Sequence, residues 1–414
     1  MTGTVGHFVL TKIDLQFSGH GPAFKLLAVS HTTNVAGDLL VALALADTLF
    51  FSVPTAEARG NMVAFLLLTL APFALIGPLL GSLAHRKPGS HRAGLVFGSL
   101  GRVVLVIAIL RAQSDLVMLS LVFGVLVLSR TYGIGRSSLL PALLPGSAEL
   151  VEANARLARL GIFAGGAFLP IGWGVLNLLG NQADLVLAAL VYAWSGVAAL
   201  RLMQIKTVPT PVDPKEDIGR AAPSTRSPAR PRSIGPARIA TAIVRLLNGY
   251  LLVLVAFAFR EGEQGIAGFG ALMAAAGAGY AISSFLARFL ARHLREEPMV
   301  AAALALEAAA AFISSHAFGV WSAAAVSLFA GLAWGTAKFG YDGLLHAGVK
   351  SSSARARTFA YSETLFQLAW VVGAVIPVLL TIPTTLGLIL AGCVALLAQV
   401  VLISTLLISL TKPA

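Results

Sequence analysis

The sequence predicts an all-α integral membrane protein with about twelve transmembrane helices, arranged as two similar six-helix halves. Three observations lead to this prediction: the composition, the long apolar segments, and the placement of basic residues between them. Of the 414 residues, 57% are hydrophobic and 12% are charged, whereas soluble domains carry about 25% charged residues. With a mean hydropathy of +0.84, the chain has too little polar surface to cover a water-soluble particle.

Apolar segments long enough to cross a bilayer recur along the whole chain, and each crossing needs about 20 residues. The connections between most of them are short. We place the spans at 27–54, 61–84, 93–112, 115–142, 157–180, 183–204, 236–258, 266–291, 298–316, 319–347, 358–381 and 384–410.

Basic residues gather in alternate connections, which is the pattern of cytoplasmic loops. The opposite connections hold only Arg59, Arg111 and Arg260. The net charge of +12 therefore reflects orientation in the membrane rather than nucleic-acid binding. We expect a multi-pass protein of the cell membrane with both termini in the cytoplasm. The basic side includes Lys12, Lys25, Arg86, Lys87, Arg92, Arg156, Arg159, residues 206–238, 288–295 and 350–357.

A segment rich in Pro, Ser and Arg at 205–237 is typical of a flexible cytoplasmic linker. It separates a half at 1–204 from a half at 238–414. The halves echo each other weakly, because LARLGIFAGGAFLPIGWG at 157–174 and TLFQLAWVVGAVIPVLL at 364–380 both place Gly shortly before Pro. Internal repeats of this kind are typical of secondary transporters, whose substrate site lies between the repeats near the midplane.

The layout of six plus six spans around a basic central loop resembles the major facilitator superfamily. The loop GPLLGSLAHRKPGSHR carries the local resemblance. The superfamily has an acidic residue where this chain has His85, and that Asp helps to latch the cytoplasmic gate. The residues that fit the superfamily's pattern are Gly77, Gly81, Arg86, Lys87 and Arg92.

Two further segments resemble the macrolide-efflux-like drug:proton antiporters and the related lysophospholipid transporters. They are NVAGDLLVALAL at 34–45 and SSLLPALLPGSAELVEANARL at 137–157. The resemblance implies export of an amphipathic compound, and it places Arg136 where the lysophospholipid transporters carry a basic residue. The antiporter motif of the fifth span is only partly present, because Leu169 stands where exporters have Gly before Pro170.

Ionisable residues inside spans cost about 2.5–3.5 kcal/mol each and usually face a cavity or a partner. Asp38 lies in the first span, with Asn34 one turn earlier on the same face. A carboxylate there can take up and release a proton, as a proton-coupled carrier requires; the alternative is a structural hydrogen bond to another helix. Asp47 lies about half a rotation away, and we expect a structural role for it.

The fourth span holds Arg130, Tyr132 and Arg136. Either arginine can pair with Asp38 or with an anionic head group through its fork of donors. Alternatively, Arg136 extends to the cytoplasmic interface. In the third span, Arg102 either locks a helix contact beside Gly98 and Gly101 or pairs with an acid.

The second half carries its own charged groups. Lys338 and Asp342 are spaced for an intrahelical ion pair, which serves either structure or transport. Arg245 and Asn248 form a second polar pair. Glu363 either faces the cavity or meets water at the cytoplasmic end. Glu307, in the ninth span, requires a partner on a neighbouring helix or a different placement of that span.

These features predict a secondary active transporter that works by alternating access, with protons coupled to export of a small amphipathic or lipid-like substrate. A lysophospholipid flippase and a transport-inactive sensor or scaffold are the alternatives. No catalytic motif, phosphate loop or metal-spaced His and Cys cluster is present in the sequence, so we expect neither an enzyme nor a cofactor. We expect a monomer.

Overall fold

The computed structural model describes residues 17, 20–51, 53–54, 57–69, 89–112, 114–144, 147–205, 234–261, 265–293, 296–349 and 352–411. Their regular structure is helical throughout. In addition to a helix at 57–69, the elements are α2 (Gly21–Ala46) continued by the π-helical turn η1 (Asp47–Phe51), α4 (Gly89–Ile109), α5 (Asp115–Leu143), α6 (Ser147–Leu179), α7 (Asn181–Gln204), α8 (Ile234–Glu261), α9 (Gly265–His293), α10 (Glu296–His316), α11 (Val320–Gly348), α12 (Ser352–Leu379) and α13 (Thr384–Thr411).

Ten helices among the described residues are long and apolar enough to cross a membrane. A shorter apolar segment, Gly270–Leu286, lies within α9. The helices follow the order and approximate bounds that the sequence predicts, so the prediction of an all-α, multi-pass membrane protein is confirmed. The linker from 206 to 233 and the second predicted span beyond residue 69 lie outside the described residues.

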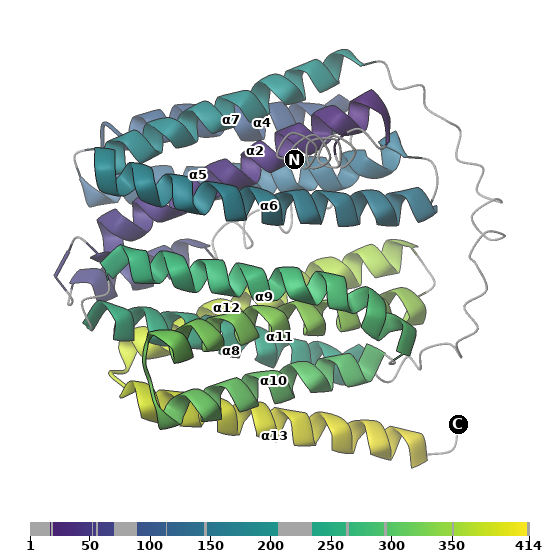
Figure 1. The fold of residues 1–414 in the computed structure, drawn as a ribbon. Coiled ribbons are helices and arrows are strands. Elements are labelled where there is room, and N and C mark those ends of the chain that lie inside the picture. Colours follow the sequence, from purple (N-terminus) through teal and green to yellow (C-terminus); the bar gives the residue numbers. More distant parts are fainter. Residues whose placement is uncertain are drawn as a thin grey trace, which may run out of the picture. The chain divides into compact units, whose positions relative to one another are not determined.

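The chain divides into two compact units: Met1–Thr48 with Ala71–Pro223, and Leu49–Leu70 with Ser224–Ala414. In the first unit, α2 packs against α6 and α7, while α4 packs against α5 and α7 (Figure 1). Phe24, Leu27, Tyr132, Leu157 and Leu202 belong to its buried core. Within the first unit, α2 therefore packs against α5, α6 and α7.

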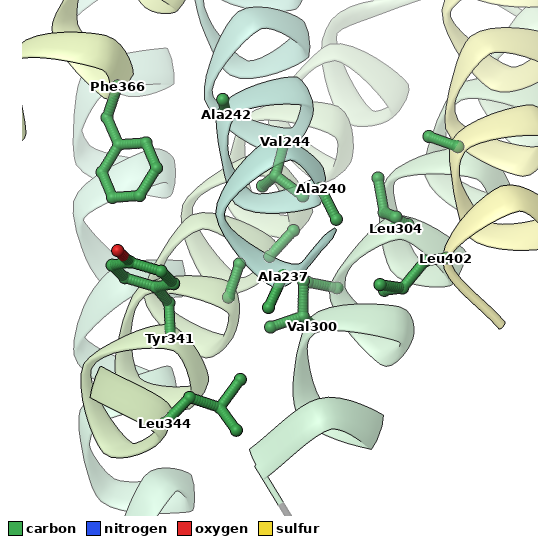
Figure 2. Close-up of a cluster of buried hydrophobic side chains, with 14 of the residues drawn as sticks. Ala237, Ala240, Ala242, Val244, Val300, Leu304, Tyr341, Leu344, Phe366 and Leu402 are labelled. Carbon is green, nitrogen blue, oxygen red and sulfur yellow. The ribbon is translucent and has the colours of Figure 1, made fainter. Parts of the chain in front are cut away.

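In the second unit, α8 packs against α12, α9 against α11, and α10 against both α11 and α13. One buried cluster joins α8, α10, α11, α12 and α13. Figure 2 shows the rings of Tyr341 and Phe366 beside each other in this cluster; they meet edge to face with centroids 5.3 Å apart. The Tyr341 hydroxyl is hydrogen-bonded to Ser362 at 2.5 Å, which satisfies its polar group inside an apolar core.

The segment 49–70 groups with the second unit, although the sequence analysis placed it in the first half. Arg59 Nη1 donates to the carbonyl oxygens of Pro377 at 3.1 Å and Val378 at 2.8 Å. These carbonyls belong to the last turn of α12, where they lack partners within the helix. Arg260 likewise donates to the Val53 carbonyl. The positions of the basic residues in the sequence indicate the orientation of the chain in the membrane, but they do not identify the carbonyl groups that Arg59 and Arg260 contact. The predicted division of the chain at 205–237 stays a prediction.

Glycine allows close helix contacts in the second unit. A Cβ on Gly331 of α11 would meet the carbonyl oxygen of Ala276 on α9, and one on Gly373 of α12 would meet that of Leu246 on α8. Backbone atoms cannot move aside as a flexible side chain can. Small residues therefore hold both pairs together, as in other membrane helix contacts.

We predict that Gly331→Ala lowers the free energy of unfolding by about 1–3 kcal/mol, because the added methyl group separates two packed backbones. Gly277→Ala on α9 is the matched control, since a Cβ there meets nothing within 4 Å. Thermal unfolding of both variants in detergent checks the prediction. Equal midpoints for the two variants would contradict it.

Candidate functional site in two charged networks

The carboxylate of Asp38 joins four helices of the first unit. Arg102 Nη1, from α4, lies 2.5 Å from Asp38 Oδ1. The Tyr192 hydroxyl of α7 donates to the same oxygen at 2.6 Å, and the Ser129 hydroxyl of α5 donates to Oδ2 at 3.3 Å. The Asp38 side chain is 38% exposed while that of Arg102 is 0% exposed. The acid is thus partly exposed, whereas its cation is fully buried.

Arg102 is held by its own helix and by aromatic rings. Its Nε donates to the Gly98 carbonyl at 2.7 Å, and its Nη1 lies 3.5 Å from Asn34 Oδ1. The guanidinium also stacks 4.5 Å from the Tyr192 ring centroid and 5.5 Å from that of Tyr132. Such stacking stabilises a desolvated cation. Both roles considered for Arg102, helix contact and ion pairing, are therefore present together.

Asp38 pairs with Arg102 and not with Arg130 or Arg136, a pairing that the sequence left as one of several possibilities. Arg136 Nη1 instead lies 3.0 Å from Nε2 of His31, and His31 lies about 10 Å along α2 from Asp38. Arg130 is exposed. It follows Ser129 by one residue, and successive helical residues are rotated by about 100°. The side chain beside Asp38 is therefore Ser129.

A buried chain of hydroxyl groups continues from this network, and the sequence analysis missed it. The Ser30 hydroxyl is hydrogen-bonded to Tyr132 at 2.9 Å and to Ser195 at 3.1 Å. Ser195 in turn meets Ser99 at 3.0 Å. A signal was present in the sequence, since Ser30, Asn34 and Asp38 are spaced four residues apart and so form one polar stripe along the helix.

The second unit gathers three charges from two helices. Lys338 Nζ lies 2.6 and 2.8 Å from the two carboxylate oxygens of Asp342, so the predicted intrahelical pair is confirmed. Glu363 Oε1 of α12 lies 2.6 Å from the same nitrogen. The side chains are 12% exposed for Lys338, 28% for Asp342 and 36% for Glu363. One lysine is thus ion-paired with two partly exposed carboxylates.

A cavity of about 240 Å³ lies in the second unit between α8, α9, α11 and α12. Arg245, Asn248, Tyr280, Trp334 and Trp370 are part of its lining. Arg245 Nη1 donates to Asn248 Oδ1 at 3.2 Å, which confirms the predicted polar pair. Its guanidinium lies 4.4 Å from the Trp334 ring centroid and 5.6 Å from that of Trp370.

The remaining candidates lie elsewhere. Of the gate-loop motif, Gly77, Gly81, His85, Arg86 and Lys87 lie outside the described residues. Arg92 donates to the Ile205 carbonyl at 2.7 Å, after the end of α7.

Three acidic residues complete the placement. Asp47 Oδ2 accepts from Asn181 at 3.3 Å. Glu307 is buried in α10, where none of the described residues hydrogen-bonds its carboxylate, so the expected partner on a neighbouring helix is not found there. Asp184 of α7, which the sequence analysis did not single out, is likewise buried with both oxygens lacking hydrogen bonds from described residues.

Comparisons with known proteins bear on the fold. No family model matches the chain. An uncharacterised protein of Mycobacterium leprae is 25% identical over 379 residues, which cover 84% of this chain and 65% of that protein. An uncharacterised protein of Mycobacterium tuberculosis is 30% identical over 139 residues, 32% of this chain and 25% of its own length. The chain therefore spans less than two thirds of the length of these relatives.

Two solved structures resemble more than nine tenths of the chain. They show a bacterial homologue of the iron transporter ferroportin in inward-facing and outward-facing states. The inward-facing structure has a TM-score of 0.61 with 14% identity and covers 91% of this chain and 96% of its own. The outward-facing structure has a TM-score of 0.58 with 16% identity and covers 93% and 99%. The chain therefore shares the all-helical fold of these transporter structures, while the major facilitator superfamily and its two branches suggested by sequence motifs stay predictions.

The Asp38–Arg102 pair predicts a specific stability pattern. Arg102→Gln leaves the Asp38 carboxylate without its cation and should cost about 3 kcal/mol, the low end for breaking a buried pair, because Asp38 is partly exposed. Asp38→Asn combined with Arg102→Gln should recover part of that loss. Thermal unfolding of the single and double variants measures this coupling, and strictly additive losses would refute it.

Proposed function

We propose that this protein is a secondary active transporter of the plasma membrane, which works by alternating access and couples protons to the export of a small amphipathic compound. The fold supports transport, because it matches one transporter in both of its facing states across more than nine tenths of this chain. Two packings of one fold are what alternating access requires.

The Asp38 carboxylate is the observation that carries the proton coupling. It is partly exposed, and it joins α2 to α4, α5 and α7. A proton on Asp38 would remove the negative charge opposite the sealed guanidinium of Arg102. The energy of the contact between these helices would then depend on protonation. Two different packings of the helices would therefore bind the proton with different affinities.

In the described state one cation and two hydroxyl donors occupy the carboxylate oxygens of Asp38. Proton uptake therefore belongs to a state in which Asp38 and Arg102 have separated. This links the proton to the conformational change rather than to simple exposure of an acid.

The Lys338 cluster is a second candidate for coupling. Protonation of either Asp342 or Glu363 leaves the other carboxylate to pair with Lys338. Such a step avoids the cost of an unpaired cation inside the membrane. Glu363 is the more exposed of the two acids and so the easier to reach from water.

Two other functions receive less support from the described residues. A lysophospholipid flippase would use Arg136 toward a head group, yet Arg136 contacts His31 of α2. The structural neighbour is described as a bacterial homologue of the iron transporter ferroportin. Among the residues described for this chain, no group of three or more His, Cys, Asp or Glu side chains is placed to hold a metal ion.

We predict that Asp38→Asn abolishes proton movement that depends on substrate, because the amide keeps the volume of the side chain but cannot be protonated. A proteoliposome assay with a trapped pH dye and a pH gradient measures this, with naphthalene-2-sulfonate and 2-naphthylmethylammonium as amphipathic probes. Glu57→Gln, at an exposed residue, is the control and should behave as the wild type. Wild-type coupling in Asp38→Asn would refute the assignment, and inactive wild-type protein would favour a sensor or scaffold.

A separate prediction concerns the second network. If Asp38 is the sole coupling acid, Glu363→Gln should retain proton movement, since Lys338 keeps Asp342 as its partner. If the Lys338 cluster also couples, Glu363→Gln should lower the proton-to-probe ratio at unchanged probe affinity. Measuring the ratio in the same proteoliposomes separates the two outcomes.

A further inference from the structure

We infer that Glu307 is a proton-binding site apart from Asp38, which lies in the second unit and stays occupied at neutral pH. Its ligand is a proton held on a carboxyl group inside the helix bundle. The inference requires no transport and so goes beyond the proposed function.

Glu307 lies at the middle of α10, on a helix face that is otherwise apolar. Ala303 and Leu304, one turn before it, belong to the buried cluster of Figure 2. Ala308 and Ala311, on its other side, belong to a second buried cluster. Residues three and four apart share a helix face, so Glu307 lies between the two clusters. The residue is 1% exposed, and its carboxyl group is therefore shielded from water in this packing.

Neither carboxyl oxygen of Glu307 has a hydrogen-bond partner among the described residues. The helices that pack against α10 are α8, α11 and α13. In α11, Lys338 and Asp342 form an ion-paired cluster with Glu363, and the Tyr341 hydroxyl is bonded to Ser362. The described part of α13 carries no charged side chain, and its titratable group is the exposed thiol of Cys393.

The charged and titratable groups of α8 likewise contact other partners. Two arginines stack on aromatic rings, while a tyrosine and a third arginine donate to backbone carbonyls. These contacts are Arg238 with Tyr361, Arg245 with Trp334 and Trp370, Tyr250 with Gly387, and Arg260 with Val53. The side chains of Glu261 and His346 lie outside the described residues, at the ends of α8 and α11 rather than beside the middle of α10.

The absence of a described partner determines the state of the carboxyl group. An ionised carboxylate without a counter-charge is far more costly to bury than a neutral carboxyl group, because the apolar interior does not solvate its charge. The neutral group loses only its hydrogen bonds to water. A metal ion would need several oxygen ligands, and no group of three or more His, Cys, Asp or Glu in the described part of the chain is placed to hold one. A proton is therefore the cation that fits.

The bound proton is tied to the packing of α10. Release of the proton from Glu307 requires water or a cation beside the carboxyl group. Both require α10 to move away from α8, α11 or α13, which enclose it. The proton on Glu307 therefore depends on how the second unit is packed, and a change of that packing would release it.

Infrared spectroscopy of the purified full-length chain in an ester-free detergent tests the inference, because a protonated carboxyl group has a C=O stretching band that a carboxylate lacks. At neutral pH the wild type should show such a band, and Glu307→Gln should lose it. Glu297→Gln is the matched control in the first turn of the same helix, where the helix N-terminus favours an ionised carboxylate. This control should keep the band.

The pH dependence of thermal unfolding is a second measurement. An unfolded chain releases the Glu307 proton above about pH 4.3, the ordinary pKa of glutamate, whereas the folded chain keeps it. Unfolding then releases a proton, so the unfolding midpoint of the wild type should fall relative to that of Glu307→Gln as the pH rises. Glu307→Leu removes the polar group altogether and should behave as Glu307→Gln, and it decides the question if the Gln variant does not fold.

Three results would overturn the inference: a wild type without a carboxyl band at neutral pH, an unchanged band in Glu307→Gln and Glu307→Leu, or the same pH dependence of unfolding in the wild type and both variants. Neither measurement involves a gradient or a transported compound. Its result is therefore independent of the proteoliposome result for Asp38.

Discussion

The ion pair between Asp38 and Arg102 is the constraint on which the first unit depends. A guanidinium that is 0% exposed cannot remain inside an apolar bundle without a counter-charge. Asp38 supplies that charge, Tyr192 and Tyr132 supply ring faces, and the neighbouring hydroxyl chain links α2, α4, α5 and α7. Moving any one of these helices would disturb this shared network.

The charged side chains of the second unit are paired differently. Lys338 is ion-paired with two partly exposed carboxylates. Arg245, which lines the cavity, stacks on two indole rings. The first unit thus buries Arg102, whose counter-charge a proton on Asp38 would remove. The second unit places Arg245 in the wall of a cavity.

The sequence predicted the helices and the side-chain pairs within one helix, and it missed the pairs between residues that are far apart in the chain. Hydropathy and basic loops located the helices, and the Lys338–Asp342 and Arg245–Asn248 pairs follow from spacing along one helix. The Asp38–Arg102 pair joins residues 64 positions apart, and three arginines were available to one acid; only helix packing selects among them. The grouping of 49–70 with the second unit could not be predicted from the sequence either, because an apolar helix face does not specify which helix it packs against.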